Sequence, residues 1–311
     1  MSDFVILDGG LGQELLHRSG DAPTHQWSMR IMHDHPELVR RLHYDYFVAG
    51  AQIATANTYA LQRDRLEGTD FENQFEVLYD LALRSAEQAR HDYGSGRIAG
   101  ALGPLNGSYR PDAHPDLMTA IPRYAECATQ MQGRVDMVIC ETVASLTHAR
   151  AALAGAHAAQ VPVWLAVTVA DDDGTYLRSG EKLRDIIPIA RDEGAEALLV
   201  NCSAPEAITE ALRELGSADL PLGAYANAFT RITDAFRQSR SNVSALQART
   251  DLGPERYADH VLEWCALGAS IVGGCCETRP EHIAEIVRRL HRANLINTSK
   301  TTNMNGEFTH D

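Results

Sequence analysis

Two adjacent cysteines, Cys275 and Cys276, close an apolar run near the carboxyl end of the chain, directly after Gly273-Gly274. A third cysteine, Cys202, ends a similar apolar run earlier in the sequence. Three thiolates gathered at one point would bind a soft metal, most plausibly zinc, and would leave a coordination position for water or substrate. The residue types therefore predict a reactive zinc site. The alternatives are a vicinal disulfide between Cys275 and Cys276, or a coincidental grouping of the cysteines.

The segments before these cysteines must bring them to one place. Short apolar runs alternate with longer segments of helical period along the whole chain. The predicted strands are 4–8, 51–55, 97–103, 136–141, 163–169, 197–201, 222–225 and 270–274. The predicted helices are 36–49, 75–93, 117–132, 146–158, 183–193, 205–215, 254–267 and 280–293. Eight strands, each followed by a helix, predict an α/β fold of the (β/α)8 TIM-barrel type.

Barrel geometry places the three cysteines on one face. Cys202 would lie at the carboxyl end of the sixth strand, and Cys275 and Cys276 at that of the eighth, and these ends open where barrel enzymes place catalysis. The long connections 11–35 and 226–252 are expected to build the site from the same side. We predict a single barrel domain over residues 1–295 and a disordered polar tail over 296–311.

Composition limits the classes of function. The chain has 311 residues, 44% of them hydrophobic, and a net charge of -14. This charge argues against nucleic acid or an anionic membrane surface as a partner. Neither a membrane-spanning stretch nor a signal peptide is evident, so a cytoplasmic protein is expected. Its six cysteines are then expected to be reduced thiols or metal ligands. The oligomeric state, including a homo-oligomer, is left open.

The cysteine motif resembles that of the homocysteine S-methyltransferases. The match consists of Gly-Gly-Cys-Cys-x-Thr-x-Pro-x-His-Ile over residues 273–283 together with Val-Asn-Cys-Ser over 200–203. Further similarities run from about residue 4 to 292, including Leu-Asp-Gly-Gly-Leu-Gly at 7–12, Asn-Thr-Tyr at 57–59 and Glu-Thr at 141–142. The resemblance implies a zinc-dependent (β/α)8 methyltransferase whose zinc is held by Cys202, Cys275 and Cys276.

The resemblance also implies that homocysteine is the acceptor and methionine the product. Asp8, Gly9 and Glu141 would receive the amino-acid end of homocysteine, since a carboxylate can pair with its ammonium group. The alternative for Asp8 is a turn-forming aspartate before glycine. For Glu141 the alternative is an acid favoured by the dipole at a helix N-terminus.

The chemistry gives the zinc a specific task. A free thiol titrates near pH ~8.5, so homocysteine at neutral pH is mostly the poorly nucleophilic thiol. Zinc would hold its sulfur as a positioned thiolate. A chain of this length leaves no room for separate cobalamin and folate domains. A small onium donor is therefore expected, S-methylmethionine or S-adenosylmethionine before betaine.

Aromatic faces can hold onium methyl groups through cation–π attraction. Trp27 and Tyr59 are the candidates, with Thr55 and Asn57 as polar positioning residues; ordinary packing or hydrogen bonding is the alternative for each. Methyl transfer to another thiol or selenol, such as selenocysteine, would use the same zinc site. A homocysteine-binding module that acts with a separate corrinoid protein is the remaining alternative.

Two further expectations concern the surroundings of the site. The connection 226–252 departs from the family, because Tyr-Ala-Asn stands at 225–227 where Tyr-Pro-Asn is usual, so specificity is expected there. His33, His35 and His43 are expected to be solvated. His282 is expected to cap or pack the last helix rather than bind zinc.

Overall fold

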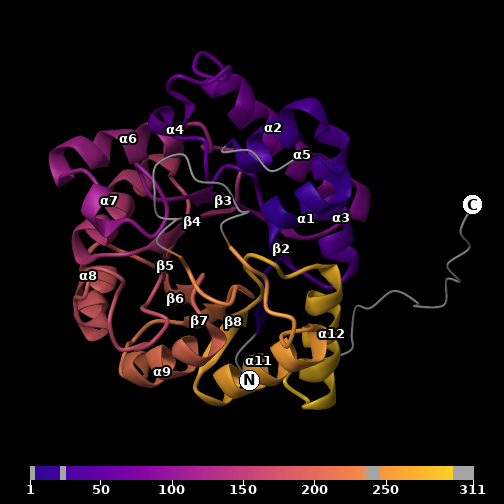
Figure 1. The fold of residues 1–311 in the computed structure, drawn as a ribbon, viewed down its shortest axis with the longest axis vertical. Helices are drawn as coiled ribbons and strands as arrows, with labels where there is room; N and C mark the ends of the chain where they lie inside the picture. The colour runs from indigo at the N-terminus through magenta and orange to yellow at the C-terminus, as the bar shows by residue number, and fades with distance from the viewer. Residues whose placement is uncertain (1–3, 22–25, 234–235, 237–245, 297–311) are drawn as a thin grey trace, which may run out of the picture.

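Eight parallel strands form one sheet at the centre of the molecule, inside a ring of helices (Figure 1). The computed structural model describes residues 4–21, 26–233, 236 and 246–296. The strands are β1 (Val5–Ile6), β2 (Ile53–Thr55), β3 (Arg97–Leu102), β4 (Met137–Val143), β5 (Val163–Val167), β6 (Ala197–Asn201), β7 (Leu222–Tyr225) and β8 (Ala269–Val272).

The sheet closes into a barrel through its first strand. The order is β1-β8-β7-β6-β5-β4-β3-β2, and β1 pairs with β8 in the register Val5↔Ile271. A parallel bridge between Leu7 and Ile53 joins the other side of β1 to β2. The protein is therefore a (β/α)8 TIM barrel, as the alternation of segments predicts.

The strands are apolar because both of their faces are buried. In β5, Trp164 and Ala166 belong to the cluster that fills the barrel interior. Their neighbours Leu165 and Val167 belong to the outer cluster between the sheet and the helices. The two-residue period of a strand thus divides each apolar run between two cores.

The helices cover the outside of the sheet. Those that follow the strands around the barrel are α3 (Pro36–Val48), α5 (Phe75–Tyr93), α6 (Leu117–Thr129), α7 (Leu146–Ala156), α8 (Ile186–Asp192), α9 (Pro205–Leu215), α11 (Pro254–Ala266) and α12 (Pro280–Arg292). Short elements complete the connections: α1 (Leu11–Ser19), α2 (Trp27–Asp34), α4 (Arg63–Leu66), and the 3-10 turns η1 (Pro111–Ala113), η2 (His157–Ala159) and η3 (Leu183–Asp185).

The connection 11–35 differs from its prediction as a long loop, because it contains α1 and α2. α1 buries Leu15 and half-buries Leu11 and Leu16, which gives this short segment an apolar face to pack. The second long connection, 226–252, is described only in part. The predicted disordered tail lies outside the described residues, apart from Ile296.

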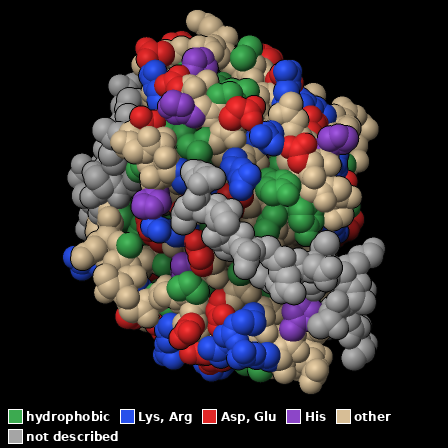
Figure 2. Space-filling model, turned by 90° about the vertical axis from the view of Figure 1, so that its right-hand side faces the viewer, with side chains coloured by type: hydrophobic (Ala, Val, Ile, Leu, Met, Phe, Trp, Pro, Cys, Tyr) green, Lys and Arg blue, Asp and Glu red, His purple; other side chains and the backbone are tan. Residues whose placement is uncertain are grey.

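Figure 2 shows one face of the molecule, where acidic and basic side chains are interspersed and hydrophobic side chains form small groups. The excess of acidic residues is therefore not gathered into one acidic surface on this face. Within the described ranges, no helix has both the length and the apolar character needed to cross a bilayer.

The prediction that His43 is solvated is wrong. Its side chain is fully buried, on the same face of α3 as Val39 and Tyr46. Residues three and four apart share one helix face, so burial of those two apolar residues carries His43 inward with them. Burial lowers the pKa of His43 to about 4, and the imidazole is neutral at pH 7.

Candidate functional site

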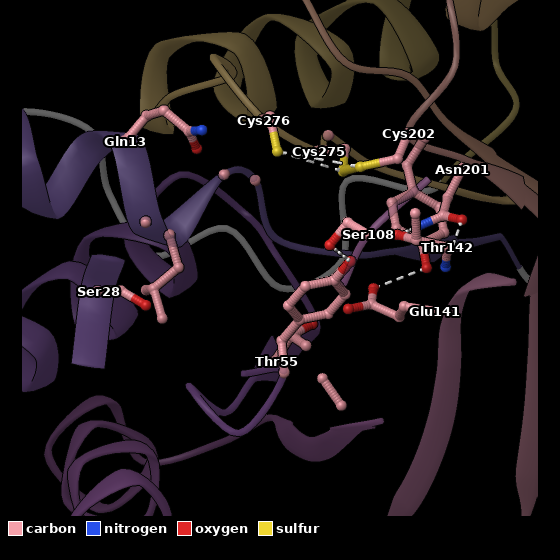
Figure 3. Close-up of a pocket in the computed structure, with 18 of the residues that line it drawn as sticks. Gln13, Ser28, Thr55, Ser108, Glu141, Thr142, Asn201, Cys202, Cys275 and Cys276 are labelled. Carbon is pink, nitrogen blue, oxygen red and sulfur yellow. Dashed lines mark hydrogen bonds between the residues drawn. A yellow bond between two sulfur atoms is a disulfide. The ribbon is translucent and has the colours of Figure 1, made fainter. Parts of the chain in front are cut away.

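A cavity opens at the carboxyl end of the barrel strands (Figure 3). Its lining brings together residues from the ends of several strands and from the connections that follow them. Among them are Asp8, Gly9, Gln13, Ser28, Thr55, Asn57, Tyr59, Ser108, Tyr109, Glu141, Thr142, Asn201, Cys202, Tyr225, Phe229, Phe236, Cys275 and Cys276. The three predicted zinc ligands and most of the predicted substrate residues therefore share one site.

The three cysteine sulfurs lie within 4.8 Å of one another. Cys202 directly follows β6, and Cys275 and Cys276 follow β8 by way of Gly273-Gly274. The sulfur of Cys276 lies 3.9 Å from that of Cys202 and 4.0 Å from that of Cys275. These separations match the about 3.8 Å expected between two tetrahedral ligands with Zn–S bonds of ~2.3 Å. The donor set therefore fits a thiophilic metal.

The structure joins Cys202 to Cys275 in a disulfide, with Cα atoms 5.9 Å apart. This differs from the expectation of reduced or metal-bound thiols, and the pair is not the vicinal one. The physical reason is that turns which bring three sulfurs together for one metal also bring two of them within bonding range. Because this disulfide uses two of the three candidate ligands, metal binding by all three sulfurs requires the reduced protein.

Backbone hydrogen bonds fix the cysteine turns against strand β7. The amide of Cys202 donates to Tyr225 O at 3.1 Å, and the amide of Cys275 donates to Ala226 O at 3.1 Å. In return, the amide of Ala228 donates to Cys276 O at 3.0 Å. Strand β7 and the residues that follow it therefore hold in place the cysteines that follow both neighbouring strands.

Tyr257 of α11 links the segments after β7 and β8 through its hydroxyl group. Its buried hydroxyl lies 2.9 Å from Ala226 N and 2.9 Å from Gly273 O. The Ala226 amide donates to the hydroxyl, a bond that a proline at this position could not make because proline has no N–H. The departure from the usual Tyr-Pro-Asn sequence thus has a structural role in this chain.

Two glycines let the chain pass closely around the three cysteines. A Cβ on Gly274 would lie 2.1 Å from Thr278 Oγ1, and a Cβ on Gly10 would lie 2.5 Å from Cys275 O. Neither position can hold a side chain without displacing the turn that carries Cys275. One glycine from each Gly-Gly pair, near the two ends of the chain, is therefore needed for close packing around the turn 274–278.

Burial raises the pKa of the Cys276 thiol to about 12. The negative charges of Glu277 and Glu141 contribute to the rise, and the side chain of Gln13 opposes it. Figure 3 shows Gln13 extending toward Cys276 from α1. A metal bound at this thiol must displace a firmly held proton, so metal loading releases protons.

Asp8 lies at the end of β1 with its carboxyl group held by Thr55. The backbone amide and the hydroxyl of Thr55 each donate to one carboxylate oxygen, both at 2.7 Å. Burial raises the pKa of Asp8 to about 6, although the bonds from Thr55 oppose the rise. Asp8 and Thr55, both predicted to be substrate-binding residues, are therefore hydrogen-bonded to each other. Together with Gly9 they line the cavity.

Glu141 belongs to β4, and its carboxyl group lines the same cavity. Tyr225 donates a hydrogen bond of 2.7 Å to Glu141 Oε1. Burial raises the pKa of Glu141 to about 7; Tyr225 lowers it and the charge of Asp8 raises it. The carboxyl groups of Asp8 and Glu141 line one cavity and could pair with an ammonium group, whose charge would favour their ionised forms.

Asn57 and Tyr59 both line the cavity, but each is engaged by a neighbouring side chain. Ser28 donates to Asn57 Oδ1 at 2.7 Å, which fastens α2 to the segment after β2. The hydroxyls of Tyr59 and Ser108 are hydrogen-bonded at 2.8 Å. Trp27 begins α2, but its side chain lies outside the described part of the structure.

Other residues of the site were not predicted. Tyr225 and Asn201 end β7 and β6, and their place as the last polar residues of predicted strands could have indicated them. Asn201 accepts a 3.0 Å hydrogen bond from Thr142 N, which follows Glu141 with a positive φ of 57°. Tyr109 and Phe229 come from irregular connections, where no periodicity marks a residue as inward-facing.

His282 caps the last helix, as predicted. Its Nδ1 accepts a 3.2 Å hydrogen bond from the backbone amide of Arg279, immediately before α12. Its Nε2 lies 3.4 Å from Leu252 O. Both ring nitrogens thus have backbone partners, and His282 is absent from the group of sulfurs that could hold a metal.

Comparison with known proteins places these observations in context. The sequence model of the family "Homocysteine S-methyltransferase" matches residues 5–290. The homocysteine S-methyltransferase of Escherichia coli (strain K12) is 30% identical, over 92% of this chain and 95% of that protein. The selenocysteine Se-methyltransferase of Brassica oleracea var. italica is 26% identical, over 96% and 92%. The crystal structure of the homocysteine methyltransferase MmuM from Escherichia coli in its metallated form has a TM-score of 0.75 and 28% identity, over 92% of this chain and 96% of MmuM.

Proposed function

Because the chain belongs to the homocysteine S-methyltransferase family and is a homocysteine methyltransferase, we propose that it uses zinc and a small onium donor. Methionine is then the product. The observation that carries this proposal is the arrangement of one cavity, which has three sulfurs within 4.8 Å of one another and two buried carboxyl groups, Asp8 and Glu141.

Cys202, Cys275 and Cys276 would hold the zinc in the reduced protein. Sulfur ligands suit zinc, and three of them leave one position for the substrate sulfur. The metal would supply a deprotonated, oriented homocysteine sulfur at neutral pH. A metallated form of the E. coli relative supports a metal at this kind of site.

Asp8 and Glu141 would bind and orient the ammonium group of homocysteine. Thr55 holds one carboxylate and Tyr225 the other, so the amino-acid end of the substrate meets preorganised partners. Fixing that end fixes the direction from which the sulfur attacks, and such positioning can supply several kcal/mol of the lowered barrier.

The charges of the cavity favour a cationic donor. Within the described residues, its lining includes Asp8 and Glu141 but no lysine, arginine or histidine. S-methylmethionine and S-adenosylmethionine carry a net positive charge at neutral pH, whereas betaine is neutral overall. In the reaction, the homocysteine sulfur forms a bond to the methyl carbon while the bond from that carbon to the onium atom breaks. The electron pair stays with the onium atom, which leaves uncharged.

Labelled donors test this proposal. The reduced, zinc-loaded protein is supplied with homocysteine and, separately, each onium compound with an isotopically labelled methyl group. We expect labelled methionine from S-methylmethionine or S-adenosylmethionine. Binding of homocysteine without turnover of any free onium donor would instead identify a module that requires a methylated corrinoid protein.

A selenol acceptor is the second candidate. It is favoured by the 26% identity with a selenocysteine Se-methyltransferase over nearly the full length of both chains. The same zinc site would serve it, because a selenolate is also a soft ligand. Competition between homocysteine and selenocysteine for one labelled donor distinguishes the two acceptors by their kcat/KM ratio.

A further inference from the structure

A second group of side chains surrounds the cysteines on an apolar side of the cavity. Tyr109, Phe229 and Phe236 pack in one buried cluster with Cys202, and Cys275 and Cys276 lie against it. We call Tyr109, Phe229 and Phe236 the aromatic wall. The rings of Tyr109 and Phe236 are tilted, with centroids 6.0 Å apart. The sulfurs are thus bordered by aromatic surface, and the same cavity is also lined by the carboxyl groups of Asp8 and Glu141.

Phe229 is held next to the metal site by the backbone on both sides. The preceding residue, Ala228, donates its amide to Cys276 O at 3.0 Å. The Phe229 amide donates to Asn227 Oδ1 at 3.1 Å, and its backbone forms an antiparallel bridge with Ala248. Its side chain lines the cavity and is only 3% exposed. Its position is therefore tied directly to the turn that carries Cys276.

Two of the three tyrosines that line the cavity, Tyr59 and Tyr109, already have cations over their rings, and the third, Tyr225, is hydrogen-bonded to Glu141. The guanidinium of Arg178 lies 4.9 Å from the Tyr109 ring centroid, and that of Arg65 lies 5.7 Å from the Tyr59 ring centroid. A cation on one face of a ring polarises the π electrons toward itself and repels a second cation. In the described part of the chain, no guanidinium or ammonium lies over Phe229.

We propose that the onium group of the methyl donor is held against Phe229, within the aromatic wall and beside Cys202 and Cys276. This inference rests on the proposed function and refines it, because it moves the donor cation away from Tyr59 and Trp27, where the sequence suggests it. A donor held there has its methyl group close to the sulfurs and on a different side from the carboxyl groups that receive homocysteine.

The wall also accounts for release of the spent donor. When the methyl carbon bonds to the homocysteine sulfur, the electron pair of the broken bond returns to the onium atom. The donor loses its positive charge at that atom, and with it the cation–π attraction to Phe229. The ring therefore binds the donor before transfer more tightly than the product after it.

The test compares a cation with an uncharged molecule of the same shape. Choline and 3,3-dimethylbutan-1-ol differ chiefly in the charge of the quaternary centre. Each is measured by calorimetry as a ligand of the reduced, zinc-loaded protein in the presence of homocysteine. In the unaltered protein we expect choline to bind the more tightly. Phe229→Leu should reduce this preference by about 10-fold, because it removes an attraction of ~1–2 kcal/mol but keeps an apolar surface.

Tyr59→Leu is the matched control, since it makes the same change at the competing ring, and we expect it to leave the preference within about two-fold. A preference that persists in Phe229→Leu and falls in Tyr59→Leu would overturn the proposal. A variant that fails to fold is replaced by 4-fluoro- and 3,5-difluorophenylalanine at position 229. These rings keep the shape of phenylalanine and weaken the π face in steps, so the preference for choline should fall with each fluorine.

Kinetics separate failure of this inference from failure of the proposed function. Turnover of an onium donor with an unchanged donor KM in Phe229→Leu would refute the aromatic site and leave the methyl transfer intact. Absence of turnover with every onium donor in the unaltered protein would refute the proposed function. In that case, if the unaltered protein also bound choline no more tightly than 3,3-dimethylbutan-1-ol, the aromatic site would be refuted as well.

Discussion

Two groups of side chains in the cavity are held in different ways. We call the carboxyl groups of Asp8 and Glu141 the polar end and the aromatic wall the aromatic end. At the polar end, Asp8 and Glu141 receive directed hydrogen bonds from Thr55 and Tyr225. At the aromatic end, Tyr109 and Phe229 are held by packing, and Ala228 next to Phe229 donates a backbone hydrogen bond to Cys276 O. A polar end can recognise the shape and charge of an amino acid, whereas an aromatic end can recognise a cation of many shapes. This difference is the basis on which we propose that the acceptor binds at the first end and the donor at the second.

The largest effect on activity should come from removing one of the three cysteine sulfurs, because both donor and acceptor are proposed to react beside them. Cys276→Ala leaves two sulfurs, which hold zinc poorly, and we expect loss of bound zinc together with a fall in kcat/KM of about 1000-fold or more. Zinc content is measured by atomic emission, and turnover with a labelled donor. Cys265→Ala is the control, because Cys265 lies in α11 outside the cluster. Full activity of Cys276→Ala would refute the zinc site.

Glu141→Gln should affect the polar end alone. An amide keeps the shape of the side chain but not the charge that pairs with the ammonium group of homocysteine. We expect KM for homocysteine to rise by about 100-fold, the equivalent of ~3 kcal/mol, because truncating a buried charge pair has effects of this size. KM for the donor should change by less than about three-fold. Equal increases in both constants would show that the two ends are not separate.

The pH dependence should also distinguish the two ends. The pKa values of Glu141 and Asp8 are raised to about 7 and about 6, so both carboxyl groups gain protons as the pH falls from 8 to 5. Protonation removes the charges that attract an ammonium group, and homocysteine should bind more weakly at lower pH. Glu141→Gln should flatten this dependence in calorimetric titrations, while choline binding at the aromatic end changes little. An unchanged slope in the variant would argue against Glu141 as the titrating group.

The same groups have the opposite effect on the stability of the ligand-free protein. A carboxyl group whose folded-state pKa is raised stabilises the fold below its unfolded pKa, and this contribution is lost as the pH rises through its folded pKa. For Asp8, a rise from 3.8 to about 6 corresponds to about 3 kcal/mol between pH 4 and 7. Asp8→Asn should reduce the fall in unfolding free energy over this range, measured by urea denaturation. A parallel profile for the variant would contradict the assignment.

Tyr225→Phe should give the smallest change. It removes the hydrogen bond that lowers the pKa of Glu141, so the midpoint for homocysteine binding should move to higher pH. At pH 7 we expect a loss of about five-fold in homocysteine affinity, since a hydrogen bond to a charged group contributes ~1 kcal/mol or somewhat more. At pH 9 the affinity should recover, because Glu141 is ionised in both proteins. A loss that is the same at both pH values would indicate a packing defect instead.

The sequence predicted the polar end better than the aromatic end, for a physical reason. Asp8 and Glu141 lie at or near the ends of regular strands, whose period and apolar character can be read directly. The barrel topology then places those ends together. Phe229 follows no period, and its inward position depends on the hydrogen bond from its neighbour Ala228 to Cys276 O and on its own bridge with Ala248. The burial of His43 was not predicted, because it lies in a stretch of the sequence that is rich in charged residues. Its apolar neighbours, Val39 and Tyr46, lie four and three residues away on the same face of α3.

The barrel closes where β8 inserts between β7 and β1. The proposed metal site can therefore form only late in folding, once this last strand is in place. While the chain emerges from the ribosome, Cys202 is exposed long before Cys275 and Cys276, and a single sulfur is a weak ligand. The complete ligand set exists only after the final strand has docked between the first and the seventh. A protein truncated before residue 275 would keep much of its core but would lack two of the three sulfurs. If the three sulfurs hold zinc as proposed, zinc binding at this site would require a completed barrel.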